Sequence, residues 1–355
     1  MFSQPAVAFV SVNGAFRFSL TFFLGKGKLN PYLIIEELRF VPARPLIDLT
    51  KWPYLRPAQE SDLPAMLEIY RPYVEQTAVS FEYALPTLAE FTQRFHAHTA
   101  RFPWLVWAEK GEVCGYAYAG APWERAAYGY CAECSVYIKP EQQRRQIGAN
   151  LYEALEQILT LQGYRLAYAL ITTENSGSLR FHEALGYAHR TLFPNCGYKF
   201  GRWHGVVWME KQLNPFGAPK AFPASWRSYP VLRHYQPSDC PALEKLFYDT
   251  VHTVCAKDYT PEALDAWAPV GARNWNESFL EHRTLVAELD GEIVGFGDAD
   301  GSYLDRLYVS CRHQRRKIAT LLCDALETAM PMETHASLTA RPFLEKRGYR
   351  VLRRQ

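Results

Sequence analysis

The stretch Val136–Glu156, VYIKPEQQRRQIGANLYEALE, occurs a second time as Leu307–Glu327, LYVSCRHQRRKIATLLCDALE, and the two copies align without a gap. Each copy begins as an apolar run typical of a strand, passes through a short basic turn, and continues with apolar residues at helical spacing. The residues that carry this spacing are Ile147, Leu151, Leu155 and Ile158, and then Ile318, Leu322 and Leu326. The repeat therefore predicts a strand–turn–helix unit that the chain uses twice.

The turn between strand and helix reads Gln-Arg-Arg-x-Ile-(Gly/Ala) in both copies, at residues 143–148 and 314–319. A turn that opens a helix points several backbone N–H groups at one place, and the helix dipole adds positive potential there. Such a place binds a phosphate or diphosphate. A small residue, Gly148 or Ala319, lets the ligand approach the backbone closely. Four arginines add positive charge: Arg144, Arg145, Arg315 and Arg316. We predict an anion-binding turn in each copy, the alternative being a solvated basic helix start.

These turns resemble the acetyl-CoA pyrophosphate loop of the GNAT family of N-acetyltransferases, whose pattern is Gln/Arg-x-x-Gly-x-Gly/Ala. Both copies depart from the pattern, because its first Gly is Gln146 in one copy and Lys317 in the other. Since the loop binds through main-chain N–H groups, we expect a side chain to be accepted there if φ stays negative. No Gly-Lys-Ser/Thr follows, which excludes a Walker loop, and G-x-G-x-x-G is absent.

The resemblance implies that acetyl-CoA is the co-substrate and that eighteen residues contact it. In the first copy these are Val136, Tyr137, Ile138, Gln143, Arg144, Arg145, Gln146, Ile147, Gly148, Ala149, Asn175 and Ser178. In the second copy they are Gln314, Arg315, Arg316, Lys317, Ile318 and Ala319. For Asn175 and Ser178, a helix-capping role is an equal alternative.

Composition narrows the classes of partner. The 355 residues carry a formal net charge of +2, so nothing indicates a nucleic-acid or anionic-membrane partner. Eight cysteines are scattered through the chain, and Cys131 and Cys134 are the only close pair. In a strand, residues three apart face opposite sides, and no zinc-type spacing accompanies this pair. We therefore predict no metal and reduced thiols in a cytoplasmic protein.

Residues 1–51 are predicted to be a poorly ordered extension. The run Ala6–Gly25 is apolar, but Ser11, Asn13 and Arg17 interrupt it. A membrane-spanning helix needs about 18 or more nearly uninterrupted apolar residues, and a secretory signal needs positive charge before its apolar core. A membrane anchor is the alternative.

Three further pairs of segments match in the same order along the chain. They are 55–66 with 232–243, 108–117 with 287–296, and 181–187 with 343–349. Together with the opening repeat, these matches indicate an internal duplication. Residues 213–229, rich in proline and without apolar periodicity, predict a semi-rigid linker. The domains are therefore placed at 52–212 (domain one) and 230–355 (domain two). Each is expected to be an α/β fold, with a mixed, mostly antiparallel sheet and helices on both faces.

Domain one is similar to the phosphinothricin and methionine sulfoximine N-acetyltransferases of this family. The resemblance rests on Ser80-Phe81-Glu82, Gly120-Ala121-Pro122-Trp123, Ala132-Glu133-x-Ser135-Val136-Tyr137, His182-Glu183-Ala184-Leu185-Gly186-Tyr187 and Gly197-Tyr198-Lys199. It implies an N-acetyltransferase that acts on small amino-acid-like amines. The relatives also carry Asp two residues after the Trp that matches Trp203, where this chain has Gly205.

Acylation of an amine requires a base, because an amino group is cationic at neutral pH and must lose a proton before it attacks. Glu133 is the candidate. It lies one strand before the anion-binding turn, and strand parity groups it with Cys131, Ser135 and Tyr137. The alternative is that Glu133 only pairs with a neighbouring cation. The resemblance implies an oxyanion donor on the strand that holds Val136–Ile138. His182 or Tyr187 is expected to protonate the leaving thiolate, His182 having the alternative of a packed helix residue.

Substrate recognition should need cations for a carboxylate and for a phosphinate, sulfone or sulfoximine oxygen. Arg125 is the best candidate, since its planar fork suits paired oxygens. The residues expected to line the pocket with it are Phe81, Tyr128, Tyr198 and Lys199. A non-catalytic acyl-CoA-binding module, or an acetyltransferase for a polyamine or aminoglycoside, are the alternatives. We expect no other partner than a small-molecule amine, and a homodimer is left open.

Domain two resembles a different branch of the same family, small bacterial enzymes of uncertain substrate. The position that matches Glu133 is Leu304, with Asp305 next to it on the other strand face. No asparagine matches Asn175, and the chain ends soon after Tyr349, without the closing strand expected at Gly205–Met209 of domain one. Three interpretations compete: an active acetyltransferase, an acyl-CoA-binding domain without catalysis, and a truncated remnant with an exposed sheet edge. The missing end favours the second or the third.

Overall fold

A computed structural model describes residues 9–12, 15–18, 46–270, 275–328 and 332–352. The chain divides into two units, 1–43 and 44–355. The described part of the first unit is an antiparallel hairpin of β1 (Phe9–Val12) and β2 (Ala15–Phe18). The prediction for residues 1–51, a poorly ordered extension or a membrane anchor, otherwise falls on residues outside the described ones up to residue 45, while residues 46–51 are described and include β3 (Ile47–Asp48) and the buried Leu49. In the part of the chain that the structure describes, no helix has the length and apolarity that crossing a membrane requires.

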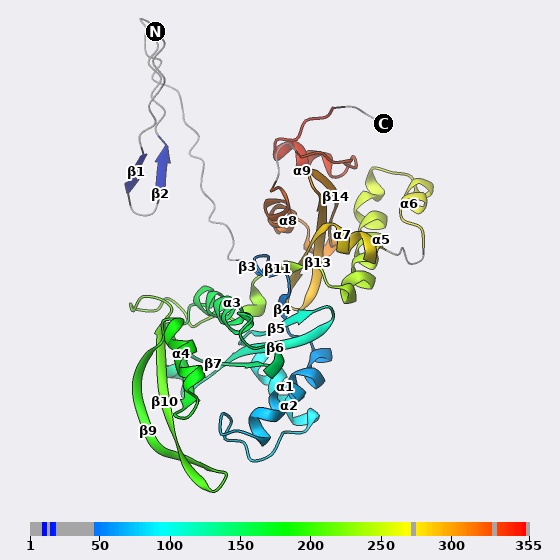
Figure 1. The fold of residues 1–355 in the computed structure, drawn as a ribbon. Helices are drawn as coiled ribbons and strands as arrows, with labels where there is room; N and C mark the ends of the chain where they lie inside the picture. Colours follow the sequence, from blue (N-terminus) through cyan, green and yellow to red (C-terminus); the bar gives the residue numbers. More distant parts are fainter. Residues whose placement is uncertain (1–8, 13–14, 19–45, 271–274, 329–331, 353–355) are drawn as a thin grey trace, which may run out of the picture. The chain divides into compact units, whose positions relative to one another are not determined.

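Domain one is built on a seven-stranded sheet in the order β4-β5-β6-β7-β8-β10-β9 (Figure 1). Its strands are β4 (Leu55–Pro57), β5 (Trp104–Glu109), β6 (Glu112–Gly120), β7 (Cys131–Ile138), β8 (Leu166–Thr172), β9 (Ala188–Lys199) and β10 (Arg202–Gln212). Its helices are α1 (Leu63–Glu75), α2 (Leu88–Thr99), α3 (Ile147–Gln162) and α4 (Ser176–Ala184), with 3-10 turns η1 (Glu60–Asp62), η2 (Ala126–Tyr128) and η3 (Pro140–Gln142). Only the β7–β8 pair is parallel.

Two apolar clusters fix which helices cover which face of this sheet. Alternate residues of β5 and β6, among them Trp104 and Tyr116, pack with α1 and α2. The intervening residues pack against α3, whose Leu151 and Leu155 are fully buried. Alternate residues of the strands thus pack against the apolar residues that recur at helical spacing in the sequence. The predicted helices on both faces of the sheet are confirmed.

Domain two has a five-stranded sheet in the order β14-β13-β12-β11-β3. Its strands are β3 (Ile47–Asp48), β11 (Val231–His234), β12 (Arg283–Leu289), β13 (Glu292–Asp300) and β14 (Tyr303–Val309). Its helices are α5 (Cys240–Val254), α6 (Pro261–Trp267), α7 (Asn276–Glu281), α8 (Ile318–Leu326) and α9 (Arg341–Lys346), with 3-10 turns η5 (Pro237–Asp239), η6 (Cys255–Lys257) and η7 (Cys311–His313). Beyond β14, the described residues add one parallel bridge, Tyr303 with Glu333, so β14 is the last described strand on this side of the sheet. The sequence predicted an exposed edge in domain two but did not assign it to a particular strand.

The duplication extends to individual hydrogen bonds. Arg56 donates to both carboxylate oxygens of Asp62 at 2.7 and 2.8 Å, and Arg233 does the same to Asp239 at 2.7 and 3.0 Å. Each aspartate also accepts from the backbone N–H three residues before it, at Gln59 and Gln236, which closes a capping box. Asp62 therefore completes the capping of the 3-10 turn η1, and α1 follows directly from Leu63 to Glu75.

The segments that flank domain one are buried. Ile47, Leu49 and Trp52 pack into the core of domain one, while the backbone of β3 pairs in parallel with β11 of domain two. In the predicted linker, which also forms the 3-10 turn η4 (Trp226–Ser228), the buried Trp226 indole donates to the Thr99 carbonyl at 3.0 Å. The boundary placed at residue 52 thus falls within a buried segment, and the linker is docked on domain one.

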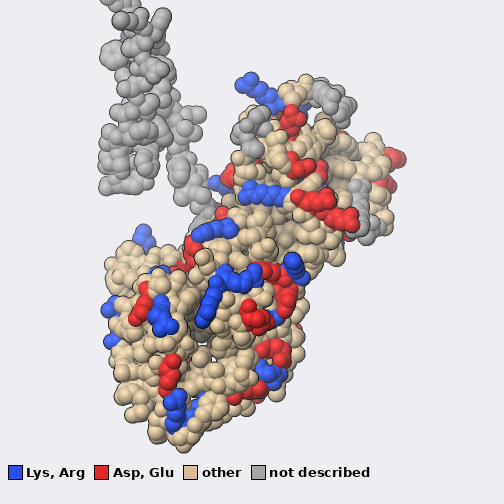
Figure 2. Space-filling model, in the orientation of Figure 1, with Lys and Arg blue, Asp and Glu red and all other residues tan. Residues whose placement is uncertain are grey.

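Acidic and basic side chains are interspersed over the described part of the face shown in Figure 2, without a large field of one sign. This pattern agrees with the formal net charge of +2. The binding chemistry of this protein is therefore to be sought in local arrangements of side chains and backbone N–H groups.

Candidate active site

The turn before α3 has the backbone of an anion-binding nest. Arg144 and Gln146 have φ of +63° and +62°, so left-handed residues alternate with the others before the helix begins at Ile147. Successive N–H groups in such an alternation converge on one point. Among the described residues, no backbone carbonyl accepts from the N–H groups of residues 144–149. These groups fit a diphosphate, which is the part of acetyl-CoA expected here.

The turn before α8 repeats this geometry. Arg315 and Lys317 have φ of +61° and +66°, and within the described chain the N–H groups of residues 315–320 have no backbone acceptor. The condition under which a side chain was expected to be accepted, a negative φ, is not met at Gln146 or Lys317. Both residues adopt the left-handed conformation that the family's glycine would adopt without strain, because the nest requires that conformation whatever the residue.

The charges around the two turns differ. Arg145 donates to both carboxylate oxygens of Glu109 at 3.1 and 2.9 Å. The Trp107 indole, and then Arg145, hold the pKa of Glu109 below its usual value. In the second turn, the described residues provide no ion-pair partner for Arg315, Arg316 or Lys317. The second turn therefore keeps more uncompensated positive charge than the first.

Glu133 lies on the α1/α2 face of β7, as strand parity predicted, because Tyr137 packs with α1 and Cys134 packs with α3. Its side chain is half-buried. No hydrogen bond or ion pair from a described residue reaches the carboxylate, and burial alone raises its pKa above the usual value. The alternative of a structural ion pair thus finds no partner among the described residues.

The two central strands separate just beyond Glu133. Strands β7 and β8 pair only at Cys131, Ala132 and Glu133, although both continue. The Lys139 N–H group donates toward β6. Because the N–H groups along a strand point alternately to its two sides, those of Val136 and Ile138 point toward the opening between β7 and β8. Ile138 N–H lies 3.4 Å from the Tyr73 hydroxyl. The Val136 N–H group has no acceptor in the described part of the chain and is free to donate into the opening.

Aromatic rings line the sheet on both sides of Glu133. Toward α2, a cavity is lined by nine residues: Tyr70, Glu82, Phe91, Arg94, His98, Trp104, Tyr116, Tyr118 and Tyr137. Arg94 forms an ion pair there with Glu82 at 2.5 Å. Toward β8, Tyr168 is the register partner of Glu133, and its ring meets Trp123 edge-on with centroids 5.5 Å apart. Glu133 thus lies between two aromatic walls.

The loop that carries Arg125 lies against the second wall. Strand β6 ends at Gly120, the register partner of Glu133, and the loop 121–130 follows. Its Trp123 stacks on Trp208 with ring centroids 5.2 Å apart and contacts Tyr128 at 4.6 Å. Arg125 is exposed, and its guanidinium has no hydrogen-bond partner among the described residues. The structure therefore brings Trp123 and Tyr128 of the loop that carries Arg125 onto the Glu133 side of the sheet.

Lys199 has a different role from the one expected. It is buried, and its ammonium donates to the carbonyls of Val74, Thr77 and Ser80 at 2.6, 3.0 and 2.7 Å. Burial lowers its pKa. All three ammonium donors are engaged, so Lys199 holds the segment after α1 and has no donor left for a substrate.

The segment held by Lys199 carries Phe81. An added Cβ at Gly197 would lie 2.2 Å from the Phe81 ring, so only glycine allows this close approach. The Tyr198 carbonyl accepts a hydrogen bond from the Tyr83 hydroxyl at 2.6 Å, and the exposed Tyr198 ring contacts Trp203. Phe81 and Tyr198 therefore lie where the segment after α1 meets the β9–β10 hairpin.

His182 and Tyr187 lie on the opposite face of the sheet from Glu133. Both ring nitrogens of His182 are engaged, Nε2 with the Tyr152 hydroxyl at 2.9 Å and Nδ1 with the Ser178 carbonyl at 2.8 Å. Burial lowers the pKa of His182. The Tyr187 side chain is buried next to Cys134 and Glu156, and burial raises the pKa of its hydroxyl. This geometry fits the packed-residue alternative for His182.

Asn175 caps α4, its side-chain oxygen accepting from the Ser178 N–H at 3.1 Å. This is the capping alternative left open for the two residues, and it leaves the Asn175 amide NH₂ available. At Gly205 a Cβ would lie 2.9 Å from the Pro194 carbonyl and 2.9 Å from Thr173. The aspartate of the relatives therefore has no room in this chain.

Several residues around Glu133 were not predicted as site residues: Glu82, Arg94, Tyr118, Trp123, Tyr168 and Trp208. Tyr118 lies opposite Ser135 on the neighbouring strand, and Tyr168 lies opposite Glu133. Strand pairing across the sheet identifies them. The sequence offered a signal only for Trp123 and Glu82, which stand inside the segments that carried the resemblance.

Comparison with known proteins agrees with this geometry. The family description "Acetyltransferase (GNAT) domain" matches twice, at residues 55–208 and at residues 255–355. A phosphinothricin N-acetyltransferase of Streptomyces viridochromogenes is 36% identical over 167 residues, which are 47% of this chain and 91% of that protein. An L-methionine sulfoximine/L-methionine sulfone acetyltransferase of Salmonella typhimurium is 32% identical over 171 residues, 47% of this chain and 98% of that protein.

Among solved structures, a GNAT superfamily phosphinothricin acetyltransferase from Sinorhizobium meliloti in complex with AcCoA is 34% identical, with a TM-score of 0.46 over 48% of this chain and 94% of that one. The sequence matches cover nearly all of each relative, and the second family match falls on the repeat that the sequence had indicated. The chain therefore belongs to the GNAT acetyltransferase family, with two such domains, and it is an N-acetyltransferase whose co-substrate is acetyl-CoA.

Proposed function

We propose that domain one acetylates the α-amino group of small amino-acid-like substrates of the phosphinothricin and methionine sulfoximine or sulfone type, with Glu133 as the general base. The observation that carries this proposal is the Glu133 carboxylate itself. It has no protein partner among the described residues, its pKa is raised by burial, and it stands between two aromatic walls beside the opening of β7 and β8. A base of raised pKa is suited to taking a proton from an ammonium near neutral pH.

Direct transfer then needs four contributions from this chain. The nest at residues 144–149 holds the diphosphate of acetyl-CoA, and the opening between β7 and β8 receives the thioester. Glu133 takes one proton from the substrate ammonium, and the freed amine attacks the thioester carbonyl. The Val136 N–H group donates to the oxyanion that develops, a contribution of about 2.7–4 kcal/mol for one good donor. The carbon–sulfur bond breaks, and the CoA thiolate takes the second amine proton.

Substrate selection is assigned to the loop 121–130. The Arg125 guanidinium is free of described partners and can hold a carboxylate or a paired phosphinate oxygen in bidentate geometry. The rings of Trp123, Tyr128 and Tyr168 give the apolar wall for the rest of the substrate. The relatives named for phosphinothricin and for methionine sulfoximine or sulfone support this substrate class.

The test is acceptor-dependent release of free CoA by the full chain. The acceptors are phosphinothricin, methionine sulfoximine, methionine sulfone and spermidine, each with wild type, Glu133→Gln and Arg125→Leu. For the first three acceptors we expect turnover, a loss of that turnover of about 100-fold or more in Glu133→Gln, and a raised KM in Arg125→Leu, whereas any turnover of spermidine should not depend on Glu133. Glu262→Gln, a change at an exposed carboxylate outside domain one, is the matched control. Turnover that is unchanged in Glu133→Gln would overturn the proposal.

A further inference from the structure

Strand β14 of domain two contains an irregularity that β7 lacks. Its pairing with β13 shifts by one residue between Arg306, opposite Asp298, and Leu304, opposite Ala299. Asp305 is the extra residue of this β-bulge. A bulge places two neighbouring side chains on about the same side of the strand, and bulges often re-aim a side chain next to an active site. The sequence placed Asp305 on the strand face opposite to Leu304, and the bulge keeps that relation while it brings Asp305 to the same side as Arg306.

Burial on β14 confirms which way these residues point. Leu304 and Leu307 pack with α8, whereas Tyr308 packs with α5. Arg306 lies over the rings of Trp275 and Phe279, at 5.1 and 4.5 Å from their centroids, on the α5/α7 side. Because Asp305 contacts Arg306 on that side, it occupies the face that Glu133 occupies in domain one, on the strand that leads into the second anion-binding turn.

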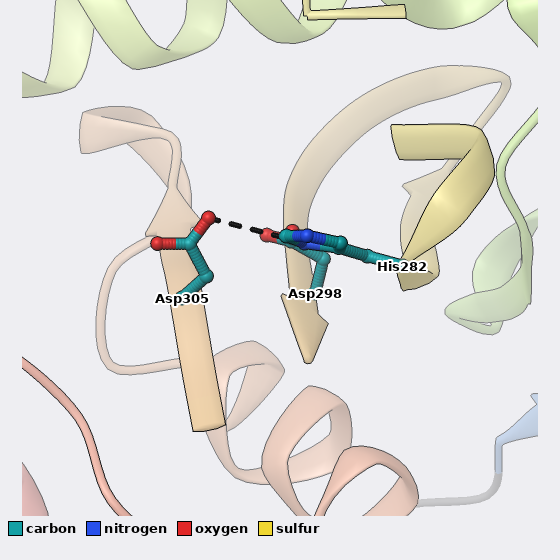
Figure 3. Close-up of side chains that lie close together, drawn as sticks. All are labelled: His282, Asp298 and Asp305. Carbon is teal, nitrogen blue, oxygen red and sulfur yellow. Dashed lines mark hydrogen bonds and ion pairs between the residues drawn. The ribbon is translucent and has the colours of Figure 1, made fainter. Parts of the chain in front are cut away.

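Asp305 belongs to a connected group of polar side chains (Figure 3). Its carboxylate lies 3.2 Å from Arg306 Nε and 3.9 Å from His282 Nδ1. Arg306 also donates to both oxygens of the fully buried Asp298, at 2.9 and 2.6 Å, and His282 Nδ1 lies 2.6 Å from Asp298. Of the two carboxylates, Asp298 is enclosed and Asp305 is 35% exposed, so Asp305 is the one that a substrate can reach.

The group is better suited to proton transfer than to a metal. A guanidinium within hydrogen-bond distance of both carboxylates supplies the positive charge that a divalent cation would otherwise supply. The same guanidinium fixes the position of Asp305, and the buried Asp298 fixes the guanidinium. A single exposed carboxylate is thereby held rigidly on the acceptor face of β14.

We propose that domain two is a second catalytic centre, in which Asp305 is the general base for acetylation of a cationic amine that carries no carboxylate next to its amino group. The proposal goes beyond the function proposed for domain one and does not depend on it. It rests on the bulge at Asp305, on the nest at residues 315–320 and on the second GNAT match.

The absence of a carboxylate from the substrate follows from two differences between the domains. The loop 121–130, which carries Arg125 in domain one, is reduced to the turn Gly301-Ser302 between β13 and β14. Among the described residues of this group, the guanidinium is that of Arg306, and it is committed to Asp298 and Asp305. In this group two carboxylates face one permanent cation, the Arg306 guanidinium, together with the His282 imidazole, so carboxylates outnumber permanent cations, which favours an amine with further positive charge. A diamine or polyamine has this chemistry.

The reaction balances without a further co-reactant. Asp305 takes one proton from the substrate ammonium and releases it to water through its exposed side. The amine nitrogen bonds to the acetyl carbon of acetyl-CoA, and the carbon–sulfur bond breaks. The CoA thiolate leaves with the second amine proton. Arg306 and His282 are positioning residues in this scheme, since neither has to touch the substrate.

The first test counts CoA sites on the full chain by calorimetry, a readout independent of activity. We expect two sites per chain, reduced to one by Gly148→Glu and to one by Ala319→Glu. Each substitution places a carboxylate where the diphosphate should lie, and an acidic residue in the first helical turn favours the helix. The Gly148 site has room, since a Cβ there would lie 3.5 Å from Phe181. One site per chain that Ala319→Glu leaves intact would overturn the proposal.

The second test uses spermidine as acceptor in the Glu133→Gln background, so that domain one is silenced. We expect spermidine-dependent release of CoA to fall about 100-fold when Asp305→Asn is added. Asp300→Asn, a change at an exposed carboxylate at the end of β13, is the matched control and should have no effect. Retention of two CoA sites by Asp305→Asn shows that the variant is folded.

Release of CoA that is absent in the Glu133→Gln background, or that is equal with and without Asp305→Asn, would overturn the assignment of Asp305. Failure of the function proposed for domain one is seen separately, as equal turnover of methionine sulfone by wild type and Glu133→Gln. The two proposals therefore stand or fall on different pairs of variants.

Discussion

At the scale of single residues, the unpartnered Glu133 carboxylate links activity to stability. Its pKa is raised in the folded chain, so the folded state binds the proton more tightly than the unfolded state does. The resulting stability is fully present below the unfolded pKa and is lost as pH rises through the folded pKa. We therefore expect Glu133→Gln to raise Tm at pH 7 relative to wild type while it lowers turnover about 100-fold or more. Thermal unfolding at pH 4 and pH 7 checks this, and a lower Tm for the variant at pH 7 would contradict it.

Replacement of Lys199, unlike replacement of Glu133, should destabilise the folded chain. Lys199→Met leaves the carbonyls of Val74, Thr77 and Ser80 without their donor. An unsatisfied buried polar group costs about 1–3 kcal/mol, so the free energy of unfolding should fall by at least that amount. Because the segment with Phe81 also loses its anchor, KM for the acceptor should rise more than kcat falls. Denaturant unfolding and steady-state kinetics measure both, and Lys220→Met, at an exposed lysine, is the control.

Sequence reasoning placed Glu133 correctly on its strand face, because parity depends only on neighbouring residues. It had no means to see that three carbonyls capture Lys199 or that Tyr152 and Ser178 engage His182. The Lys199 contacts join segments that are about 120 residues apart, and the Tyr152 contact of His182 joins helices α3 and α4. Both depend on packing that no local sequence pattern encodes.

At the scale of elements, the two anion-binding turns tolerate strain at the position where the family pattern has glycine. Gln146 has φ of +62°, a conformation that costs an ordinary residue about 1–2 kcal/mol and glycine almost nothing. After the entropy of the more flexible unfolded chain is subtracted, Gln146→Gly should raise the free energy of unfolding by roughly 0.5–1 kcal/mol. Gln143→Gly, at a φ of −66°, should lower it. Denaturant unfolding of the two variants decides, and destabilisation by Gln146→Gly would contradict the assigned geometry.

The strand–turn–helix repeat could be predicted because apolar periodicity and turn composition are local. The separation of β7 from β8 after Glu133 and the bulge at Asp305 could not, since both are properties of how two strands pair. The bulge matters most for function. Without it, Asp305 would point away from the acceptor face, as the sequence alignment of the two copies suggested.

At the scale of the whole molecule, residues 46–52 serve both domains. Ile47 is buried in the core of domain one while its backbone pairs with Val231 of β11. Removal of residues 1–52 deletes this strand together with the buried Leu49 and Trp52, whereas removal of residues 1–43 deletes none of them. We expect the shorter deletion to leave Tm unchanged and the longer one to lower Tm by 10 °C or more, since large buried side chains contribute about 2–5 kcal/mol each. Equal Tm values would contradict this role.

The duplicated architecture was predictable from four matched segments, because a repeat needs no knowledge of packing. The shared segment was not, because Ile47 belongs to neither repeat in the sequence. The proline-rich linker was expected to be extended, yet Trp226 is buried in the same core as Ile47. Linker composition predicts backbone stiffness but says little about which side chains find a surface to pack on.

The central claim is that the half-buried Glu133 removes the proton from the acceptor amine. The pH dependence of kcat/KM for methionine sulfone, measured on the full chain as wild type and as Glu133→Gln, tests it most directly. The wild-type profile should fall on the acid side as Glu133 takes up a proton, at a pH above the usual glutamate pKa. In Glu133→Gln that fall should disappear, and kcat/KM should be about 100-fold lower or more on the plateau. A variant profile that matches the wild type in height and shape would contradict the account.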